Sequence, residues 1–252
     1  MHFTKMQGLG NDYLFFFGPA PENASALSRQ LSDRHFGPGA DGLIFIGPSE
    51  RADFRMRIFN ADGSEATMCG NGIRCVGKYV YDRALTDKTE LLVETGAGLR
   101  RLWLHPENSK VVSVTVEMGR ASVVPGREGD YVDVGNPHLV RFVSDAAQVP
   151  LSALGPELCA SVCGGTNVEF VQVLGPERLR MRVWERGSGI TLACGTGACA
   201  AAAAAVRRGF CPPDQPVTVL LDGGQLQITV GACGEVRMEG PAETVYEGEI
   251  AL

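Results

Sequence analysis

The sequence predicts an α+β fold of two pseudo-symmetric domains, each a curved mixed or antiparallel, barrel-like β-sheet wrapped around a central helix. Three observations support this prediction: an internal repeat, short stretches of alternating apolar residues separated by Gly and Pro, and one pronounced helix in each repeat. A chain of 252 residues with 44% hydrophobic residues is long enough for two modest domains with cores of their own.

The repeat is found by aligning the chain with itself at an offset of 125 residues, since 194 − 69 = 125. Cys69-Gly70-Asn71-Gly72 then falls on Cys194-Gly195-Thr196-Gly197. The match extends without gaps to pairs far from the cysteines: Gly10-Asn11 and Gly135-Asn136, Gly39 and Gly164, Phe45 and Phe170, and Arg57-Ile58-Phe59 and Arg182-Val183-Trp184. Two copies of one folding unit explain this register.

The domain boundaries follow from the ends of the repeat. There the offset slips to 121, with Gly119 on Gly240, as expected if one loop changed length. We expect a first domain at residues 1–118 and a second at 119–241, with the segment 242–252 returning to the first domain.

Apolar periodicity indicates the elements within each copy. Residues 43–46, 111–116, 217–221 and 226–230 are expected to be strands. Residues 70–83 and the alanine-rich run 195–208 are expected to be helices, the second ended by Gly209 and Pro212-Pro213. A helix of small side chains suits close enclosure by other backbone.

Charge and cysteine content restrict the class of protein. The net charge is −6 without a cluster of Lys and Arg, so we expect a small-molecule substrate and neither a nucleic acid nor a membrane partner. The chain shows no secretory signal pattern, so we expect a cytoplasmic location with the eight cysteines reduced. The cysteines form no CxxC pair, and no metal is expected.

Cys69 and Cys194 are the candidate catalytic residues. Each precedes a helix start, where unpaired backbone N–H groups and the helix dipole favour a thiolate. A dipole contribution of up to ~2 kcal/mol would lower a thiol pKa from about 8.5 to near neutrality. If both cysteines lie in an active site in the cleft between the domains, mutual repulsion favours one thiolate and one thiol. That pair suits inversion of a carbon centre by one base and one acid.

The glycines beside the two cysteines suit binding of a carboxylate. Two converging helix starts would hold the anion and stabilise the negative charge that develops on loss of an α-proton. No cofactor is needed for this chemistry, and none of the four Lys residues lies in a recognisable pyridoxal phosphate setting. The alternative is that both cysteines are buried packing residues, but the other six have no cysteine at the equivalent position of the other copy.

Four separated motifs, in order, resemble those of the diaminopimelate epimerase family: 5–12 (KMQGLGND), 59–72 (FNADGSEATMCGNG), 135–138 (GNPH) and 184–197 (WERGSGITLACGTG). The resemblance covers nearly the whole chain. It implies a cofactor-independent homodimeric isomerase that interconverts LL- and meso-diaminopimelate, in lysine and peptidoglycan precursor biosynthesis.

The resemblance also implies roles for individual residues. Cys69 and Cys194 would exchange protons with the α-carbon, His138 and Glu185 would modulate the two thiols, and Tyr246 would lie at the dimer contact. The substrate would be bound by Asn11, Asn60, Gly70, Asn71, Asn136, Asn167, Glu185, Arg186, Gly195 and Thr196.

The broken symmetry of the repeat is an independent argument for this substrate. Asn60-Ala61 is replaced at the offset by Glu185-Arg186, an acid and a base that could bind the ammonium and carboxylate groups of a second amino-acid head. A solvated ion pair, a structural His138 and asparagines that only form turns are the alternative interpretations.

Three other functions remain open. The chain could be a two-cysteine racemase of proline, hydroxyproline or histidine, an isomerase of related fold with a carboxylate base, or an amino-acid binding protein without activity. Glu185-Arg186 and the matched cysteines argue against them.

Overall fold

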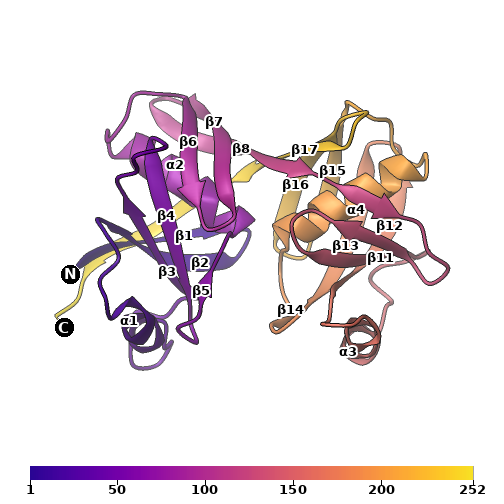
Figure 1. Ribbon diagram of the computed structural model, residues 1–252, viewed down its shortest axis with the longest axis horizontal. Coiled ribbons are helices and arrows are strands. Elements are labelled where there is room, and N and C mark those ends of the chain that lie inside the picture. Colours follow the sequence, from indigo (N-terminus) through magenta and orange to yellow (C-terminus); the bar gives the residue numbers. More distant parts are fainter. Residues whose placement is uncertain (252) are drawn as a thin grey trace. The chain divides into compact units, whose positions relative to one another are not determined.

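The computed structural model describes residues 1–251, which divide into two compact units. One unit contains residues 1–116 and 240–251, and the other contains residues 117–239. The strands β8 (Lys110–Arg120) and β17 (Glu235–Pro241) pass from one unit to the other. The second unit is therefore an insertion in the first. Both units mix strands and helices, which confirms the α+β class (Figure 1).

The first unit consists of two helices and a mixed sheet. Its elements are β1 (His2–Gly8), β2 (Asn11–Phe17), α1 (Ala24–Leu31), β3 (Gly42–Gly47), β4 (Phe54–Asn60), β5 (Glu65–Ala66), α2 (Gly70–Asp82), β6 (Glu90–Thr95), β7 (Gly98–Glu107), most of β8, and β18 (Glu243–Glu249). Strand β1 pairs antiparallel with both β2 and β18, whereas β2 and β3 are parallel.

The second unit repeats this order. Its elements are β9 (Ser122–Val124), β10 (Asp130–Asp133), β11 (Pro137–Phe142), α3 (Leu151–Ser161), β12 (Asn167–Gly175), β13 (Arg178–Glu185), β14 (Gly189–Ile190), α4 (Gly195–Arg207), β15 (Pro216–Leu221), β16 (Gly224–Val230) and most of β17. Strands β11 and β12 are parallel and β13 follows antiparallel, as for β2, β3 and β4.

The helices α2 and α4 occupy the centres of their units. Both have 13 residues, and they lie 125 residues apart in sequence at both ends, since 195 − 70 = 125 and 207 − 82 = 125. Residues 198–205 of α4 are all buried, and the helix contacts strands β9 to β13, β15 and β16 (Figure 1). Small side chains allow this enclosure because the surrounding strands can approach the helix closely.

Two shorter helices were not expected from the sequence. Helix α1 packs on β3 and β4, and α3 packs on β12, β13 and β14. Leu27 and Leu31 of α1 join a cluster with Phe16, Phe45 and Phe59. Leu151 and Leu158 of α3 join the equivalent cluster around Phe170. Each sheet is therefore covered on its second face as well, and the residues that carry the candidate site are fixed on a rigid support.

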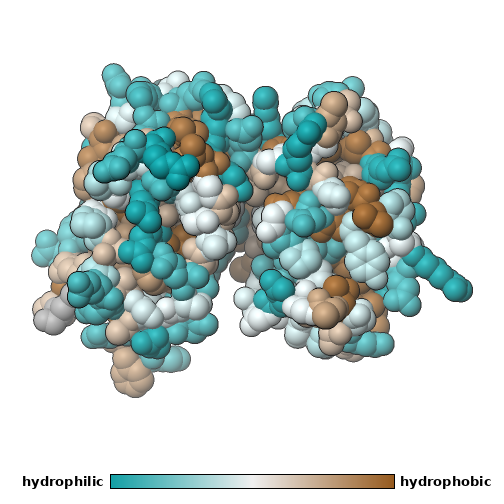
Figure 2. Space-filling model, viewed as in Figure 1, coloured by the Kyte–Doolittle hydropathy of each residue, from teal (hydrophilic) through white to brown (hydrophobic). Residues whose placement is uncertain are grey.

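The face drawn in Figure 2 is covered mainly by hydrophilic residues, with hydrophobic ones in small patches. Among residues 1–251, no helix combines the length and apolar character needed to cross a lipid bilayer.

Candidate functional site

Cys69 and Cys194 have the same local geometry. Each is the N-cap of its helix in an extended conformation, with φ and ψ of −138° and 117° at Cys69 and −119° and 111° at Cys194. Each sulfur accepts the backbone N–H three residues ahead: Gly72 N lies 3.3 Å from the Sγ of Cys69, and Gly197 N lies 3.4 Å from that of Cys194. The sulfur thus occupies the position that a Ser or Asp oxygen takes in an ordinary N-cap.

Glycine at the third helical position permits this close approach. A Cβ on Gly197 would lie 2.7 Å from Oε1 of Glu169 and 3.3 Å from the Sγ of Cys194. A Cβ on Gly72 would lie 2.6 Å from Cδ1 of Ile44. The surroundings of the two glycines therefore differ: Gly197 faces a carboxyl oxygen and its own cysteine, whereas Gly72 faces the end of a flexible side chain.

Several of the expected substrate-binding residues surround Cys69 in the first unit. The Cys69 thiol donates to Oδ1 of Asn11 at 3.3 Å, and Nδ2 of Asn71 lies 3.4 Å from the same oxygen. Nδ2 of Asn11 donates to Oδ2 of Asp41 at 2.7 Å. Gly70 and Asn71 form the buried first turn of α2. These residues bring an amide and the N–H groups of a helix start to the sulfur.

Asn60 lies at the end of β4, and the next residue, Ala61, donates its backbone N–H to the carbonyl of Asp41. The Asn60 side chain donates to Oγ of Ser64 at 3.0 Å, and its backbone N–H donates to the carbonyl of Ser64. It therefore orders the turn that leads toward β5.

The corresponding residues of the second unit form a connected network at Cys194. Oγ1 of Thr196 lies 3.5 Å from the Cys194 sulfur and accepts from Nδ2 of Asn136 at 3.4 Å. Oδ1 of Asn136 lies 3.1 Å from Nε2 of His138, whose Nδ1 lies 2.7 Å from Oε1 of Glu169. The side chains of His138 and Glu169 are fully buried. Gly195 lies beside Thr196 in the first turn of α4.

Glu185 and Arg186 differ in what they contact. Oε1 of Glu185 accepts from the Thr191 hydroxyl at 2.5 Å, and its carboxyl group lies close enough to Cys194 for the two groups to affect each other's pKa. Arg186 is exposed, and its guanidinium donates to the carbonyls of Gly164 and Gly165 at 3.0 and 3.4 Å. Its backbone N–H donates to Oδ1 of Asn167 at 2.8 Å. The guanidinium is not paired with Glu185, so the carboxyl group and the guanidinium can each bind a different group of a ligand.

Burial changes the expected acidity of both thiols. It raises the pKa of Cys69, although N–H groups of Gly72 and Asn71, a Tyr13 hydrogen bond and the Arg74 charge oppose the shift. It raises the pKa of Cys194 well above the usual range, and the nearby carboxylates of Glu185 and Glu169 add to the effect. The prediction that the helix start alone would bring the thiols near neutrality is therefore wrong, because it omitted desolvation.

The carboxyl group of Glu185 is itself affected. Burial raises its pKa, while the hydrogen bonds from Thr191 and Cys194 act in the opposite direction. A carboxyl group that holds its proton more readily repels a neighbouring thiolate less. Glu185 lies close to the thiol of its own unit, whereas His138 is connected to Cys194 through Asn136 and Thr196.

Two residues at the site were not identified from the sequence. Tyr13 is buried on β2, two residues after Asn11, and Glu169 lies next to Gly197 and binds His138. The register contains a signal for both. Tyr13 occupies the position of His138, since 138 − 13 = 125, and Glu169 replaces the core residue Ile44, since 169 − 44 = 125. A charged residue in the register of a buried Ile indicates a polar contact that the other copy lacks.

Tyr246 lies on β18, and its side chain is 41% exposed. Its ring packs edge-on against Phe3, and its hydroxyl donates to the carbonyl of Pro38 at 3.4 Å. The strand that carries Tyr246, β18, pairs with β1, which pairs with β2 on its other side.

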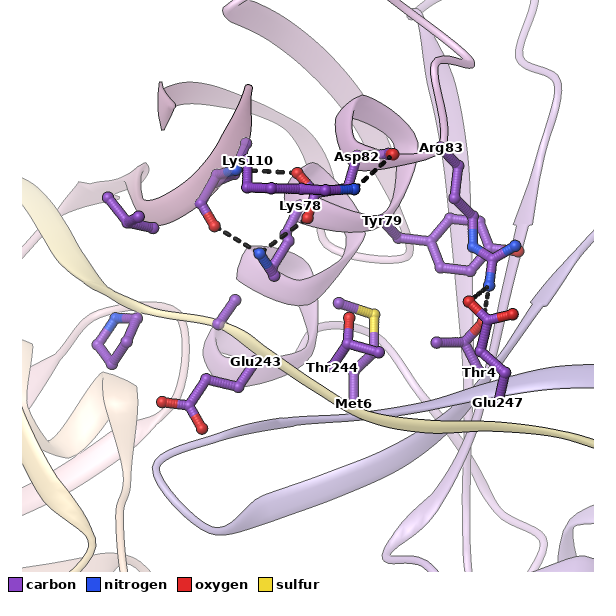
Figure 3. Close-up of a pocket in the computed structure, with 14 residues that line it drawn as sticks. Thr4, Met6, Lys78, Tyr79, Asp82, Arg83, Lys110, Glu243, Thr244 and Glu247 are labelled. Atoms are coloured by element: carbon purple, nitrogen blue, oxygen red, sulfur yellow. Dashed lines mark hydrogen bonds and ion pairs between the residues drawn. The ribbon is translucent and has the colours of Figure 1, made fainter. Parts of the chain in front are cut away.

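A separate cavity of about 690 Å³ opens beside the last turns of α2. Figure 3 shows two ion pairs among its lining residues: Nζ of Lys78 contacts Asp82 at 2.8 Å, and Arg83 contacts Glu247 at 2.5 Å. The cavity lies at the opposite end of α2 from Cys69. Four of its charged side chains are already paired within the protein, so it is a weaker candidate than the cysteine sites.

Comparisons with known proteins agree over the whole chain. The diaminopimelate epimerase family matches residues 3–124 and 131–245. The diaminopimelate epimerase of Bacteroides thetaiotaomicron is 49% identical over 264 residues, covering 98% of this chain and 97% of that protein. That of Methanococcus maripaludis is 46% identical over 279 residues, covering both chains completely.

Solved structures share the fold at low sequence identity. A PhzF-family phenazine biosynthesis protein from Bacillus anthracis has a TM-score of 0.82 at 15% identity, covering 100% of this chain and 99% of that chain. A hydroxyproline epimerase from Agrobacterium vitis has a TM-score of 0.77 at 16% identity, covering 99% and 90%. Because the sequence match spans nearly every residue at almost half identity, the chain belongs to the diaminopimelate epimerase family.

Proposed function

We propose that this chain is an isomerase that interconverts LL- and meso-diaminopimelate by two-base proton transfer between Cys69 and Cys194, in lysine and peptidoglycan precursor biosynthesis. The main support is the matched placement of the two cysteines, each an N-cap with its sulfur held by an N–H of its own helix, in a chain of this family. The reaction requires both sulfurs at one α-carbon, on opposite faces.

The proton balance of the reaction closes without a cofactor. One cysteine, as thiolate, removes the α-proton and becomes a thiol. The other, as thiol, delivers its proton to the opposite face and becomes the thiolate. The reverse reaction restores the starting state, so a single shared proton is enough for both directions.

The α-carboxylate of the substrate would be bound by the two helix starts. The N–H groups of Gly70 and Asn71 and those of Gly195 and Thr196 belong to first turns, where backbone donors lack helical partners. Negative charge moves toward this carboxylate as the proton leaves. Donors fixed in advance stabilise that charge more in the transition state than in the ground state.

The second amino-acid head of the substrate would meet polar side chains of both units. The Glu185 carboxyl group would accept from an ammonium, and the Arg186 guanidinium would bind a carboxylate. Asn11, Asn60, Asn136 and Asn167 would supply further amide contacts. In this proposal His138 and Glu185 modulate the cysteine pair. Their contacts, to Glu169 and to Cys194, support that role.

We also place the enzyme in the cytoplasm as a homodimer with Tyr246 at the contact. The mechanism needs free thiols, which a reducing compartment maintains. An exposed aromatic side chain on a strand with few covered residues suits a subunit contact. Light scattering of the wild type and of Tyr246→Ala tests this: a monomeric wild type contradicts the dimer.

The test of the function is a substrate panel with purified protein. Diaminopimelate, proline, trans-4-hydroxyproline, histidine and lysine are incubated separately in deuterated water and analysed by chiral chromatography and mass spectrometry. We expect inversion and α-deuteration of diaminopimelate only. Inversion of proline or hydroxyproline in its place would identify the alternative racemase, and tight binding without deuteration would identify a binding protein.

The test of the mechanism uses variants of the cysteines. Cys69→Ala and Cys194→Ala should each abolish epimerisation. Cys199→Ala is the matched control, because Cys199 is a buried cysteine of the same alanine-rich helix as Cys194. Full turnover in either catalytic variant, or equal loss in the control, contradicts the two-base scheme.

A further inference from the structure

We propose that Asp41 is a positioning residue for Cys69: its carboxylate holds the Asn11 amide in the orientation that presents an oxygen, and not an N–H group, to the sulfur. This inference rests on the proposed function, in which Cys69 is one of the two bases. It adds a residue that acts on that base through a neighbour, without touching the sulfur itself.

The backbone of the first unit places Asp41 beside Asn11. Asp41 immediately precedes β3, and Asn11 is the first residue of β2, which runs parallel to β3. The N–H of Asp41 donates to the carbonyl of Asp12 at 2.8 Å, and the carbonyl of Asp41 accepts the N–H of Ala61 at 2.9 Å. Because backbone hydrogen bonds hold Asp41 on both sides, its side chain starts from a fixed point at the beginning of the sheet.

Three donors occupy the Asp41 carboxylate. Oδ2 accepts from Nδ2 of Asn11 at 2.7 Å and from the backbone N–H of Asp12 at 3.0 Å. Oδ1 accepts from the Arg34 guanidinium at 3.0 Å. Both oxygens therefore have a donor, and the oxygen that faces Asn11 can only accept.

The orientation of the Asn11 amide follows from this contact. A carboxylate has no hydrogen to donate, so the Asn11 group that faces Asp41 has to be the NH2 group. The amide oxygen points the other way, where the Cys69 thiol donates to it at 3.3 Å and Nδ2 of Asn71 donates to it at 3.4 Å. The reverse orientation would set the amide oxygen against a carboxylate and the NH2 group against two donors.

The hydrogen bonds at Cys69 are consequently those of a thiol. The sulfur accepts the backbone N–H of Gly72 at 3.3 Å and donates its S–H to Oδ1 of Asn11. An amide oxygen stabilises the S–H form and disfavours a negative charge beside it. We expect this acceptor to act in the same direction as burial, which raises the pKa of the thiol. A thiol that keeps its proton can deliver it to the α-carbon after the other cysteine has removed one.

The second unit is arranged differently at the same register. The position equivalent to Asp41 is Thr166, since 166 − 41 = 125. The counterpart asparagine, Asn136, contacts the side chains of Thr196 and His138 at 3.4 and 3.1 Å. Control of an asparagine by a carboxylate is therefore a feature of the first unit, where the repeat is broken.

Asp41 belongs to a cluster of two positive and two negative side chains. Lys5 binds Asp12 at 2.8 Å, and Arg34 binds Asp12 at 2.7 Å and Asp41 at 3.0 Å. Loss of the Asp41 charge would leave the cluster positive, and a positive charge by itself favours a thiolate nearby. The experiment therefore has to separate this direct effect from the effect through Asn11.

The groups close to the sulfur include one charge. Arg74 favours the thiolate and opposes the effect of burial at Cys69. Burial raises the pKa of Tyr13 well above its usual range and that of Cys75 to about 12, so both stay uncharged at neutral pH. All three groups are unchanged in the variants below.

A double-mutant cycle separates the direct effect from the effect through Asn11. Wild type, Asp41→Asn, Asn11→Ala and the double variant are treated with iodoacetamide over a range of pH, and modification of Cys69 is followed by peptide mass spectrometry. An amide at position 41 can donate as well as accept, so Asn11 becomes free to turn its NH2 group toward a thiolate.

We expect Asp41→Asn to lower the Cys69 midpoint by about one pH unit, the size of one hydrogen bond. When residue 11 is already alanine, the same substitution should shift the midpoint by less than about 0.3 unit. The midpoint of Cys194 should stay unchanged. An equal shift in both backgrounds overturns the proposal, because the Asp41 charge would then act directly, and so does the absence of any shift.

Asp12→Asn is the matched control. It removes a carboxylate of the same cluster, but this carboxylate binds Lys5 and Arg34. It should move the Cys69 midpoint less than Asp41→Asn does, and an equal effect contradicts the inference.

If Asp41→Asn does not fold, the wild type labelled with ¹⁵N-asparagine provides the test. By NMR, the side-chain amide protons of Asn11 should exchange with solvent more slowly than those of Asn60, which donates to the Ser64 hydroxyl at an exposed position. Equal exchange rates overturn the proposal.

The alkylation cycle needs no substrate, so its outcome is independent of the proposed function. If the wild type does not act on diaminopimelate but the Asp41 effect still depends on Asn11, the proposed substrate is wrong and the role of Asp41 stands. If the wild type inverts diaminopimelate and the cycle shows no coupling, the proposed function stands and the role of Asp41 is wrong.

Discussion

The equivalent glycines Gly72 and Gly197 should respond differently to alanine, although both occupy the third position of their helices. A new Cβ at position 72 would meet the ends of two flexible side chains, Cδ1 of Ile44 at 2.6 Å and Cε of Met56 at 3.2 Å. One at position 197 would meet Oε1 of Glu169 at 2.7 Å and both heavy side-chain atoms of Cys194 within 3.3 Å. Glu169 is held by a 2.7 Å contact with His138 and cannot move freely.

The magnitudes follow from these contacts. Replacing Gly by Ala within a helix gains about 1 kcal/mol, and overpacking a well-filled core costs about 1–3 kcal/mol. We expect Gly72→Ala to change the free energy of unfolding by less than about 1 kcal/mol, because Ile44 and Met56 can change rotamer. Gly197→Ala should lose about 1–2 kcal/mol, which lowers Tm by about 2–8 °C in a chain of this size.

Urea unfolding and calorimetry of the two variants measure this difference. Activity provides a second readout, because displacement of Glu169 and Cys194 should lower kcat in Gly197→Ala more than in Gly72→Ala. A Gly197→Ala variant as stable as Gly72→Ala would refute the reasoning, since it would mean that Glu169 can move away at no cost.

Three further predictions concern charge. Cys69 should be alkylated at lower pH than Cys194. Both thiol pKa values are raised, but that of Cys194 is raised more, so its thiolate forms only at higher pH. Alkylation followed against pH by mass spectrometry measures the order, and the reverse order contradicts the prediction. Asp130→Ala should lower the free energy of unfolding in urea by about 2–4 kcal/mol, because it removes a buried carboxylate bound by Arg208 at 2.6 Å. Glu235→Ala is the comparison: its pair with Arg120 is exposed, so the loss should be less than about 1 kcal/mol. Burial raises the pKa of Asp12, but Arg34 and Lys5 outweigh it and hold that pKa below its usual value. The stabilisation is present above about pH 4 and is lost as pH falls through the lowered pKa, so Asp12→Asn should be less stable than the wild type at pH 7, and the difference in urea unfolding should shrink as the pH is lowered below about 4.

The sequence predicted helices and strands correctly where the apolar periodicity and the register of the internal repeat agree. The helices expected at 70–83 and 195–208 are α2 and α4 within a residue, and the strands expected at 43–46 and 217–221 are the centres of β3 and β15. Each of these segments is buried, so its apolar pattern is strong.

The two shorter helices could not be predicted in the same way. Helix α1 has only eight residues and no side-chain hydrogen bond at its N-cap. Helix α3 contains Pro156 directly after Gly155, a pair that normally interrupts a helix. Tertiary packing stabilises both: a Cβ on Gly155 would lie 2.6 Å from the Trp184 side chain, so the helix rests directly on β13.

The composition of the candidate site was predictable, but its electrostatics were not. Residue types and register brought Asn11, Cys69 and Asn71 together correctly. The pKa of a thiol depends on how much water reaches it and on which neighbours are charged, and neither quantity follows from local sequence. The contact between Asn11 and Cys69 spans 58 residues and is made only once β2 packs against the start of α2.

The insertion of the second unit into the first affects how the chain can fold during synthesis. Residues 117–239 are contiguous and can reach their final contacts as soon as they leave the ribosome, whereas β1 waits for β18, which is translated after them. Until then one edge of β1 is open to pairing with other chains. The first unit, although its translation begins first, is thus completed after the second. Loss of β18 would therefore destabilise the first unit and leave the contacts within residues 117–239 intact.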